Sequence, residues 1–76
     1  MRREYKIRLS EISDVKDFVT SAEKCDFDID ISYNRFIIDA KSILGVLSLD
    51  LTKVLTVQCA EKNADFEKTI QKYCVA

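Results

Sequence analysis

A serine beside an apolar turn is the residue of this chain best placed for chemistry. Ser42 follows Lys41 and precedes Ile43 in the stretch "AKSILGVLSLD". A serine in this setting is a good N-cap, because its oxygen can accept a hydrogen bond from a free backbone N–H group. The same N–H groups, the helix dipole and the neighbouring cation would also stabilise a phosphoryl group. The stretch predicts a short helix from Ile43, with Ser42 as its cap and as a candidate phosphoacceptor; capping alone also explains the serine.

The turn after Ser42 holds more apolar side chains than one face of a short helix can bury. We therefore expect Leu44 and Leu47 to point outward and to form a docking patch for another protein. Gly45, between them, permits a close backbone approach or a break in the helix. The predicted partner-binding residues are Lys41, Ile43, Leu44, Gly45 and Leu47.

Three aspartates at alternate positions resemble the start of a calcium loop. Asp26, Asp28 and Asp30 are separated by apolar residues. A calcium loop also needs a glycine at its sharp turn and a later bidentate glutamate, and neither is in place here. The alternation predicts instead that the three carboxylates lie on the outer face of a strand, and no metal site is predicted.

The remaining nucleophiles lack activating neighbours. Cys25 falls near the end of a predicted helix, where the dipole disfavours a thiolate, and Cys59 and Cys74 fall on predicted core faces. Histidine is absent, which removes the usual general base and the commonest metal ligand. Without a base–nucleophile pair, a metal cluster or a phosphate loop, the chain is not expected to be an enzyme or to need a cofactor.

Length and composition indicate one small soluble domain over residues 1–76. Apolar residues make up 47% and charged residues 33%, a balance typical of a folded chain with a thin core. The net charge of -1 gives no basis for nucleic-acid binding. No apolar run approaches the roughly 18 residues of a membrane span, and no signal-peptide pattern is present. We expect a cytoplasmic protein with reduced thiols.

Hydrophobic periodicity predicts seven elements. Period two predicts strands over residues 4–10, 25–32, 32–40 and 53–60, with a tight turn at Asn34, which tolerates positive φ. Helical spacing predicts helices after the N-caps Ser13, Ser42 and Asn63. The predicted fold class is α+β, with order β-α-β-β-α-β-α. A four-stranded, mainly antiparallel sheet would be covered on one face by helices.

The motif "KSILGVLSL" resembles the KSIMGVMSLG-type signature around the regulatory serine of the HPr family, the small phosphocarriers of the bacterial phosphotransferase system. The stretch "KCDFDIDISYNRFIIDAK" has the length and pattern of that family's preceding helix end and hairpin. The resemblance covers nearly the whole chain, and it implies the open-faced β-sandwich of HPr.

One departure from the family is chemical. HPr carries its phosphoryl group on a histidine between the first strand and first helix, followed by alanine, arginine and proline. Here the region reads "LSEISDVKDF", which has no histidine, arginine or proline. The chain thus resembles a degenerate HPr similar to catabolite-repression HPr, which lacks the histidine and keeps the serine. Asp50, where a glycine is usual, is a further departure.

The resemblance implies a regulatory role for the serine motif. Ser42 matches the serine that HPr kinase/phosphorylase modifies, and Leu44 and Leu47 match the docking surface for a transcriptional regulator. The missing arginine weakens the match to the regulator-binding surface. The resulting hypothesis is a protein–protein interaction module switched by phosphorylation of Ser42. The alternatives are a phosphocarrier homologue and a phosphate-independent oligomerising module in which Leu44 and Leu47 meet their own copies.

Overall fold

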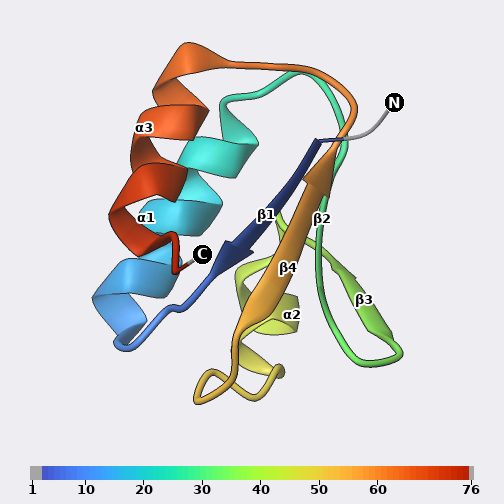
Figure 1. The fold of residues 1–76 in the computed structure, drawn as a ribbon, viewed down its shortest axis with the longest axis vertical. Helices are drawn as coiled ribbons and strands as arrows, with labels where there is room; N and C mark the ends of the chain where they lie inside the picture. Colours follow the sequence, from blue (N-terminus) through green and yellow to red (C-terminus); the bar gives the residue numbers. More distant parts are fainter. Residues whose placement is uncertain (1–2, 76) are drawn as a thin grey trace.

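The computed structural model describes residues 3–75 and has the predicted element order. Three helices lie against a four-stranded antiparallel sheet (Figure 1). The strands are β1 (Arg3–Ile7), β2 (Ile29–Tyr33), β3 (Phe36–Asp39) and β4 (Leu55–Cys59). The helices are α1 (Ile12–Glu23), α2 (Ile43–Leu47) and α3 (Ala64–Tyr73). The predicted α+β sandwich is confirmed. None of these helices is long and apolar enough to cross a membrane within the described residues.

The sheet has the order β1-β4-β2-β3, so the last strand occupies its centre and β3 lies at one edge. Strand alternation sorts the side chains of β4 as predicted. Leu55, Val57 and Cys59 are buried on the helix side, whereas Thr56 and Gln58 are half-buried on the open side. The Lys6 ammonium donates to the Thr56 hydroxyl at 2.8 Å. The open face is therefore largely polar, and the core lies between sheet and helices.

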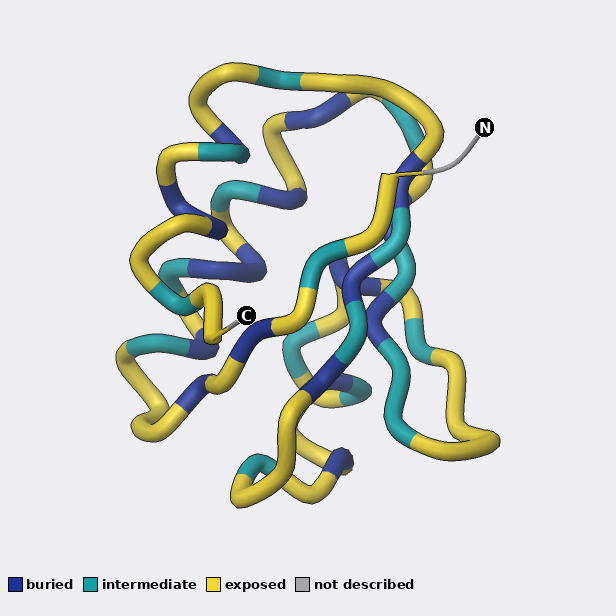
Figure 2. Tube along the Cα trace, in the orientation of Figure 1, coloured by how far each residue is buried: buried dark blue, intermediate teal, exposed yellow. Residues whose placement is uncertain are grey.

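Helices α1 and α3 form the second layer. Buried positions recur along both helices on the sides that face the sheet (Figure 2). The rings of Phe18 and Phe66 meet with centroids 5.9 Å apart. At the rim, the Asp17 carboxylate accepts hydrogen bonds from the Lys72 ammonium at 2.8 Å and the Tyr73 hydroxyl at 2.7 Å. Apolar contact and a charged anchor thus hold the two helices together.

The predicted start of the first helix needs correction, whereas that of the last is confirmed. Helix α1 begins after Glu11, so the predicted N-cap Ser13 is wrong. The Asp14 carboxylate accepts hydrogen bonds from the backbone N–H groups of Ser10 and Glu11, a capping-box arrangement. The helix therefore begins earlier in the sequence than predicted, at Ile12. Asn63 is the N-cap of α3 as predicted, and its side-chain oxygen accepts from the Phe66 N–H at 2.9 Å.

Cys74 does not lie on a core face, because α3 ends at Tyr73. It has extended backbone at φ -65 and ψ 135, is exposed, and forms a β-bridge with Ile7. The Val75 N–H donates to the Lys6 carbonyl at 3.0 Å, so the chain after α3 extends the β1 edge. The helical spacing of the sequence therefore extends one residue beyond the end of the helix.

The second strand is shorter than predicted. It begins at Ile29, where the ladder to Cys59 begins and where the Ile29 carbonyl accepts from the Ala40 N–H at 2.9 Å. Asp26 and Asp28 therefore precede the strand, and only Asp30 lies on its outer face. The predicted hairpin is present, and Asn34 has the positive φ of 54 that its turn requires.

Candidate functional site

Ser42 is the N-cap of α2, as predicted. Its backbone is extended at φ -102 and ψ 105, and its side-chain oxygen accepts from the Gly45 N–H at 3.2 Å. The residue is exposed, so its hydroxyl can be approached from solvent while it caps the helix. The serine therefore combines a structural contact with accessibility.

Asp39 positions the serine, a role that the sequence reading missed. Its carbonyl accepts from the Ser42 N–H at 3.0 Å, and its carboxylate accepts from the Lys41 N–H at 2.9 Å. This side-chain contact to the residue two positions on is an Asx-type turn. The sequence Asp-Ala-Lys-Ser is compatible with such a turn, because aspartate favours turns of this type.

Lys41 is held by a tertiary contact that sequence alone does not show. Its ammonium donates to the Cys25 carbonyl at 2.9 Å, just beyond the end of α1. The contact ties the residue before Ser42 to the chain just beyond the end of α1. A cation on a carbonyl at a helix end is also a favourable partner for the helix dipole.

The short helix divides its apolar side chains between core and solvent, as expected. Val46 is buried and Ile43 packs partly against the core, whereas the Leu44 side chain is 79% exposed and that of Leu47 is 37% exposed. The two leucines lie three residues apart and so share one side of the helix. Burial of these two side chains against a protein partner would remove apolar surface from water, which is favourable.

Gly45 is required by packing between α2 and β3. A Cβ atom at this position would lie 2.6 Å from Cγ2 of Ile38, which is well inside contact distance. The glycine thus allows the helix to approach the strand, and its backbone φ is not positive. Of the two roles expected for this glycine, the structure shows the close approach.

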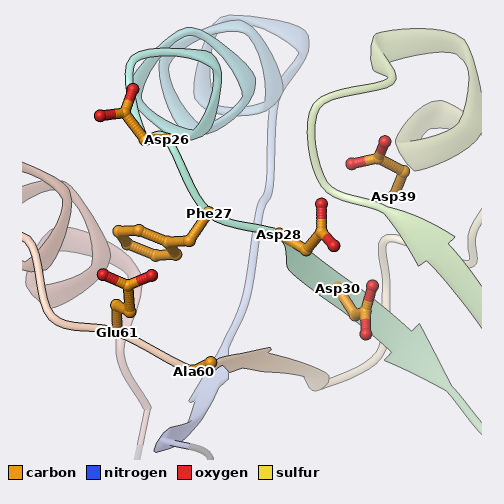
Figure 3. Close-up of a pocket in the computed structure, with 7 residues that line it drawn as sticks. All are labelled: Asp26, Phe27, Asp28, Asp30, Asp39, Ala60 and Glu61. Carbon is orange, nitrogen blue, oxygen red and sulfur yellow. The ribbon is translucent and has the colours of Figure 1, made fainter.

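Four aspartates lie around a hollow with a volume of about 590 Å³. Figure 3 shows the carboxylates around it, which come from β2, from β3, from the residues before β2 and from those after β4. Its lining residues are Asp26, Phe27, Asp28, Asp30, Asp39, Ala60 and Glu61. Within residues 3–75, no group of three or more histidine, cysteine, aspartate or glutamate side chains has the arrangement of a metal site.

The N-terminus of α1 is occupied by the chain's own carboxylate. Asp14 accepts from two backbone N–H groups there, at 3.0 Å from Ser10 and 3.2 Å from Glu11. An external phosphate would have to displace that carboxylate and approach its negative charge. This end of α1 is therefore poorly suited to hold a phosphoryl group.

The described cysteines are free thiols. Burial raises the pKa of the Cys25 thiol, and the nearby Asp26 carboxylate acts in the same direction against the Lys41 ammonium. Its sulfur contacts the Ser21 carbonyl at 3.6 Å. A raised pKa leaves little thiolate at neutral pH, so Cys25 is unsuited to nucleophilic chemistry.

Comparison with known proteins connects this geometry to one fold. No protein-family model matches the chain, and no curated protein matches its sequence significantly. Several solved structures match its fold, among them two that cover nearly its full length. The phosphocarrier protein HPr from Bacillus anthracis str. Ames matches with a TM-score of 0.71 at 21% identity, covering 96% of this chain and 95% of its own. HPr-C-His from Thermoanaerobacter tengcongensis matches with a TM-score of 0.72 at 19% identity, covering 95% of this chain and 88% of its own. The chain therefore has the fold of the HPr phosphocarrier proteins.

Proposed function

We propose that this protein is an HPr-like interaction module without phosphohistidine carrier activity, switched by phosphorylation of Ser42. The observation that carries the proposal is the pairing of an exposed, capping serine with an exposed leucine two residues on. The proposed docking surface consists of Lys41, Ile43, Leu44, Gly45 and Leu47. By resemblance, its partners are an HPr kinase/phosphorylase and a transcriptional regulator, and its location is the cytoplasm.

Phosphorylation at Ser42 would change the docking surface without requiring α2 to unfold. A phosphoryl group adds a charge of about -1.5 to -2 and three strong acceptor oxygens. The Gly45 N–H already donates to the serine oxygen at 3.2 Å and lies at the start of α2, where backbone N–H groups favour an anion. The modified surface would then present an anion beside Leu44, which suits a partner with an arginine or lysine at the rim of an apolar pocket.

Carrier chemistry has no support in this chain. Histidine is absent from the 76 residues, so no phosphoimidazole can form. The Asp14 carboxylate fills the start of α1, and a carboxylate acceptor would instead give an acyl phosphate. We infer that the chain acts by contact with other proteins rather than by passing on a phosphoryl group or by catalysis.

The deciding experiment is intact-mass measurement with peptide mapping after incubation with ATP and an HPr kinase from the same organism. We expect one added phosphoryl group on Ser42, absent in Ser42→Ala. Ser48→Ala is the matched control, since it removes an exposed serine from the other end of the same helix. No modification by the kinase would overturn the switch.

A parallel sample with phosphoenolpyruvate and enzyme I tests the other half of the proposal. We expect its mass to stay unchanged. A phosphoryl group transferred in this sample would show that carrier activity persists without histidine, and mapping would identify the acceptor.

A further inference from the structure

The chain itself holds both backbone groups and the side-chain oxygen of Ser42. The Ser42 N–H donates to the Asp39 carbonyl at 3.0 Å, and the Ser42 carbonyl accepts from the Val46 N–H at 2.9 Å. Its side-chain oxygen accepts from the Gly45 N–H at 3.2 Å. A serine hydroxyl has one O–H donor and two acceptor lone pairs, so the hydroxyl proton and one lone pair remain for a reaction. The exposed oxygen is therefore held in place by the fold.

The two residues before the serine are anchored as well. Ala40 is buried, and its N–H donates to the Ile29 carbonyl at 2.9 Å. The Lys41 ammonium donates to the Cys25 carbonyl at 2.9 Å. The Lys41 N–H donates to the Asp39 carboxylate, also at 2.9 Å. This last bond closes the turn that leads from the end of β3 into the cap of α2.

The two contacts of Asp39 differ in what they require of the side chain. Any residue at this position could offer its carbonyl to the Ser42 N–H. The bond from the Lys41 N–H, in contrast, needs a side-chain oxygen, which aspartate and asparagine provide and alanine does not. Loss of this bond would return backbone freedom to the residues that hold Ser42. The Asp39 side chain therefore limits the conformations from which the serine can react.

We propose that Asp39 is a positioning residue for phosphorylation of Ser42, acting through its side-chain oxygen and not through its charge; this inference rests on the proposed function. In the reaction, the Ser42 oxygen forms a bond to the γ-phosphorus of ATP while the bond from that phosphorus to the β–γ bridging oxygen breaks. ADP leaves with the electron pair, and the serine proton passes to a base of the kinase. A nucleophile that is already oriented loses less freedom on reaching the transition state. Asp39 acts on this step through Lys41 and the backbone of Ser42.

The charge of Asp39 offers a competing explanation, and the two make different predictions. A carboxylate near the serine could attract basic groups of the kinase or repel the phosphates of ATP. Asp39→Asn removes the charge and keeps an oxygen that can accept from the Lys41 N–H. Asp39→Ala removes both the charge and the oxygen. Positioning through the turn therefore predicts that only the alanine variant is impaired, whereas a charge effect predicts that the two variants behave alike.

Steady-state kinetics with ATP and the HPr kinase, over a range of concentrations of this protein, test the proposal. We expect Asp39→Ala to lower kcat about tenfold with KM changed less than about twofold, because the docking leucines lie outside the turn. Asp39→Asn should keep at least about half of the wild-type kcat. Asp28→Ala is the matched control, since Asp28 is exposed, lines the same hollow as Asp39 (Figure 3) and lies outside the turn. It removes the same charge and should leave both constants unchanged.

Amide hydrogen exchange followed by NMR checks the cause without the kinase. The Lys41 N–H should exchange faster in Asp39→Ala than in wild type or Asp39→Asn, while core amides stay protected in all three and show that the variants fold. Unchanged exchange at Lys41, an unchanged kcat in Asp39→Ala, or an equal loss of kcat in both Asp39 variants would each overturn the positioning role. A wild-type protein that the kinase leaves unmodified would instead refute the proposed function itself, so the two failures are distinguishable.

Discussion

At the scale of single residues, Gly45 is the position that packing constrains most tightly. A Cβ atom added at Gly45 would lie 2.6 Å from the Cγ2 methyl group of Ile38. This methyl group has little freedom to move, because isoleucine is branched at Cβ. Overpacking of this kind costs about 1–3 kcal/mol, and the better helix propensity of alanine offsets up to ~1 kcal/mol. We expect Gly45→Ala to lower the free energy of unfolding in urea by about 1 kcal/mol. In an Ile38→Ala background the same change should be neutral or stabilising; an unchanged penalty there would contradict the steric explanation.

The pKa of Asp17 leads to a second prediction for a single residue. The sign of the change in stability with pH follows from the difference between its folded and unfolded pKa. The hydrogen bonds from Lys72 and Tyr73 lower the pKa of the Asp17 carboxyl. A lowered folded-state pKa gives stability that is fully present above the unfolded value of about 3.9 and is lost as pH falls through the folded pKa. We expect Asp17→Asn to be less stable than wild type at pH 7 and to approach it in acid. Unfolding in urea at both pH values measures this, with the exposed Asp28→Asn as control. A constant difference at all pH values would argue against it.

At the scale of elements, α2 depends on its cap because it has only five residues. An isolated helix of this length is far too short to be stable by itself. Ser42→Ala removes the acceptor for the Gly45 N–H and should lower the free energy of unfolding by about 1 kcal/mol. Ser42→Asp keeps an acceptor and should recover most of that loss, which urea unfolding can measure. If both variants were equally unstable, the cap would not be the cause.

The elements were largely readable from the sequence because their patterns are local. The alternation around Val57 predicts a half-buried strand, and Asn34 and Asn63 predict a turn and a helix start, all of which the structure has. The predictions for two element ends are wrong because these ends depend on contacts beyond the local pattern. The start of α1 depends on capping by Asp14, and the start of β2 depends on where its ladder with β4 begins, at Ile29.

The candidate site shows the same division. The exposure of Leu44 follows from too many apolar residues in one turn, and the cap at Ser42 follows from its place before them. The bond from Lys41 to the Cys25 carbonyl joins residues 16 positions apart, and the contact of Gly45 with Ile38 joins a helix to an edge strand. Such contacts depend on how the layers pack, which local pattern does not specify.

At the scale of the whole molecule, one cluster of buried side chains joins both layers. The reactivity of the three cysteines can measure how this cluster opens, because two of them lie inside it and one lies outside. Cys59 lies in the central strand β4 and Cys25 follows α1, and both belong to this core. Cys74 lies outside it and is exposed. Since Cys25 and Cys59 share one cluster, both should react only when that cluster opens as a unit.

Alkylation with iodoacetamide under native conditions, followed by mass mapping, measures this cooperativity. We expect Cys74 to be modified first, and Cys25 and Cys59 to react at least about a hundredfold more slowly, given the stability of a small domain. Gly45→Ala should speed the reaction of both buried thiols by the same factor, because it lowers the stability of the core they share. Cys74→Ser is the control that removes the fast phase alone. If Cys25 reacted as fast as Cys74 while Cys59 stayed protected, the end of α1 would open by itself. The anchor from Lys41 would then be too weak to hold α2 and its serine in a fixed place.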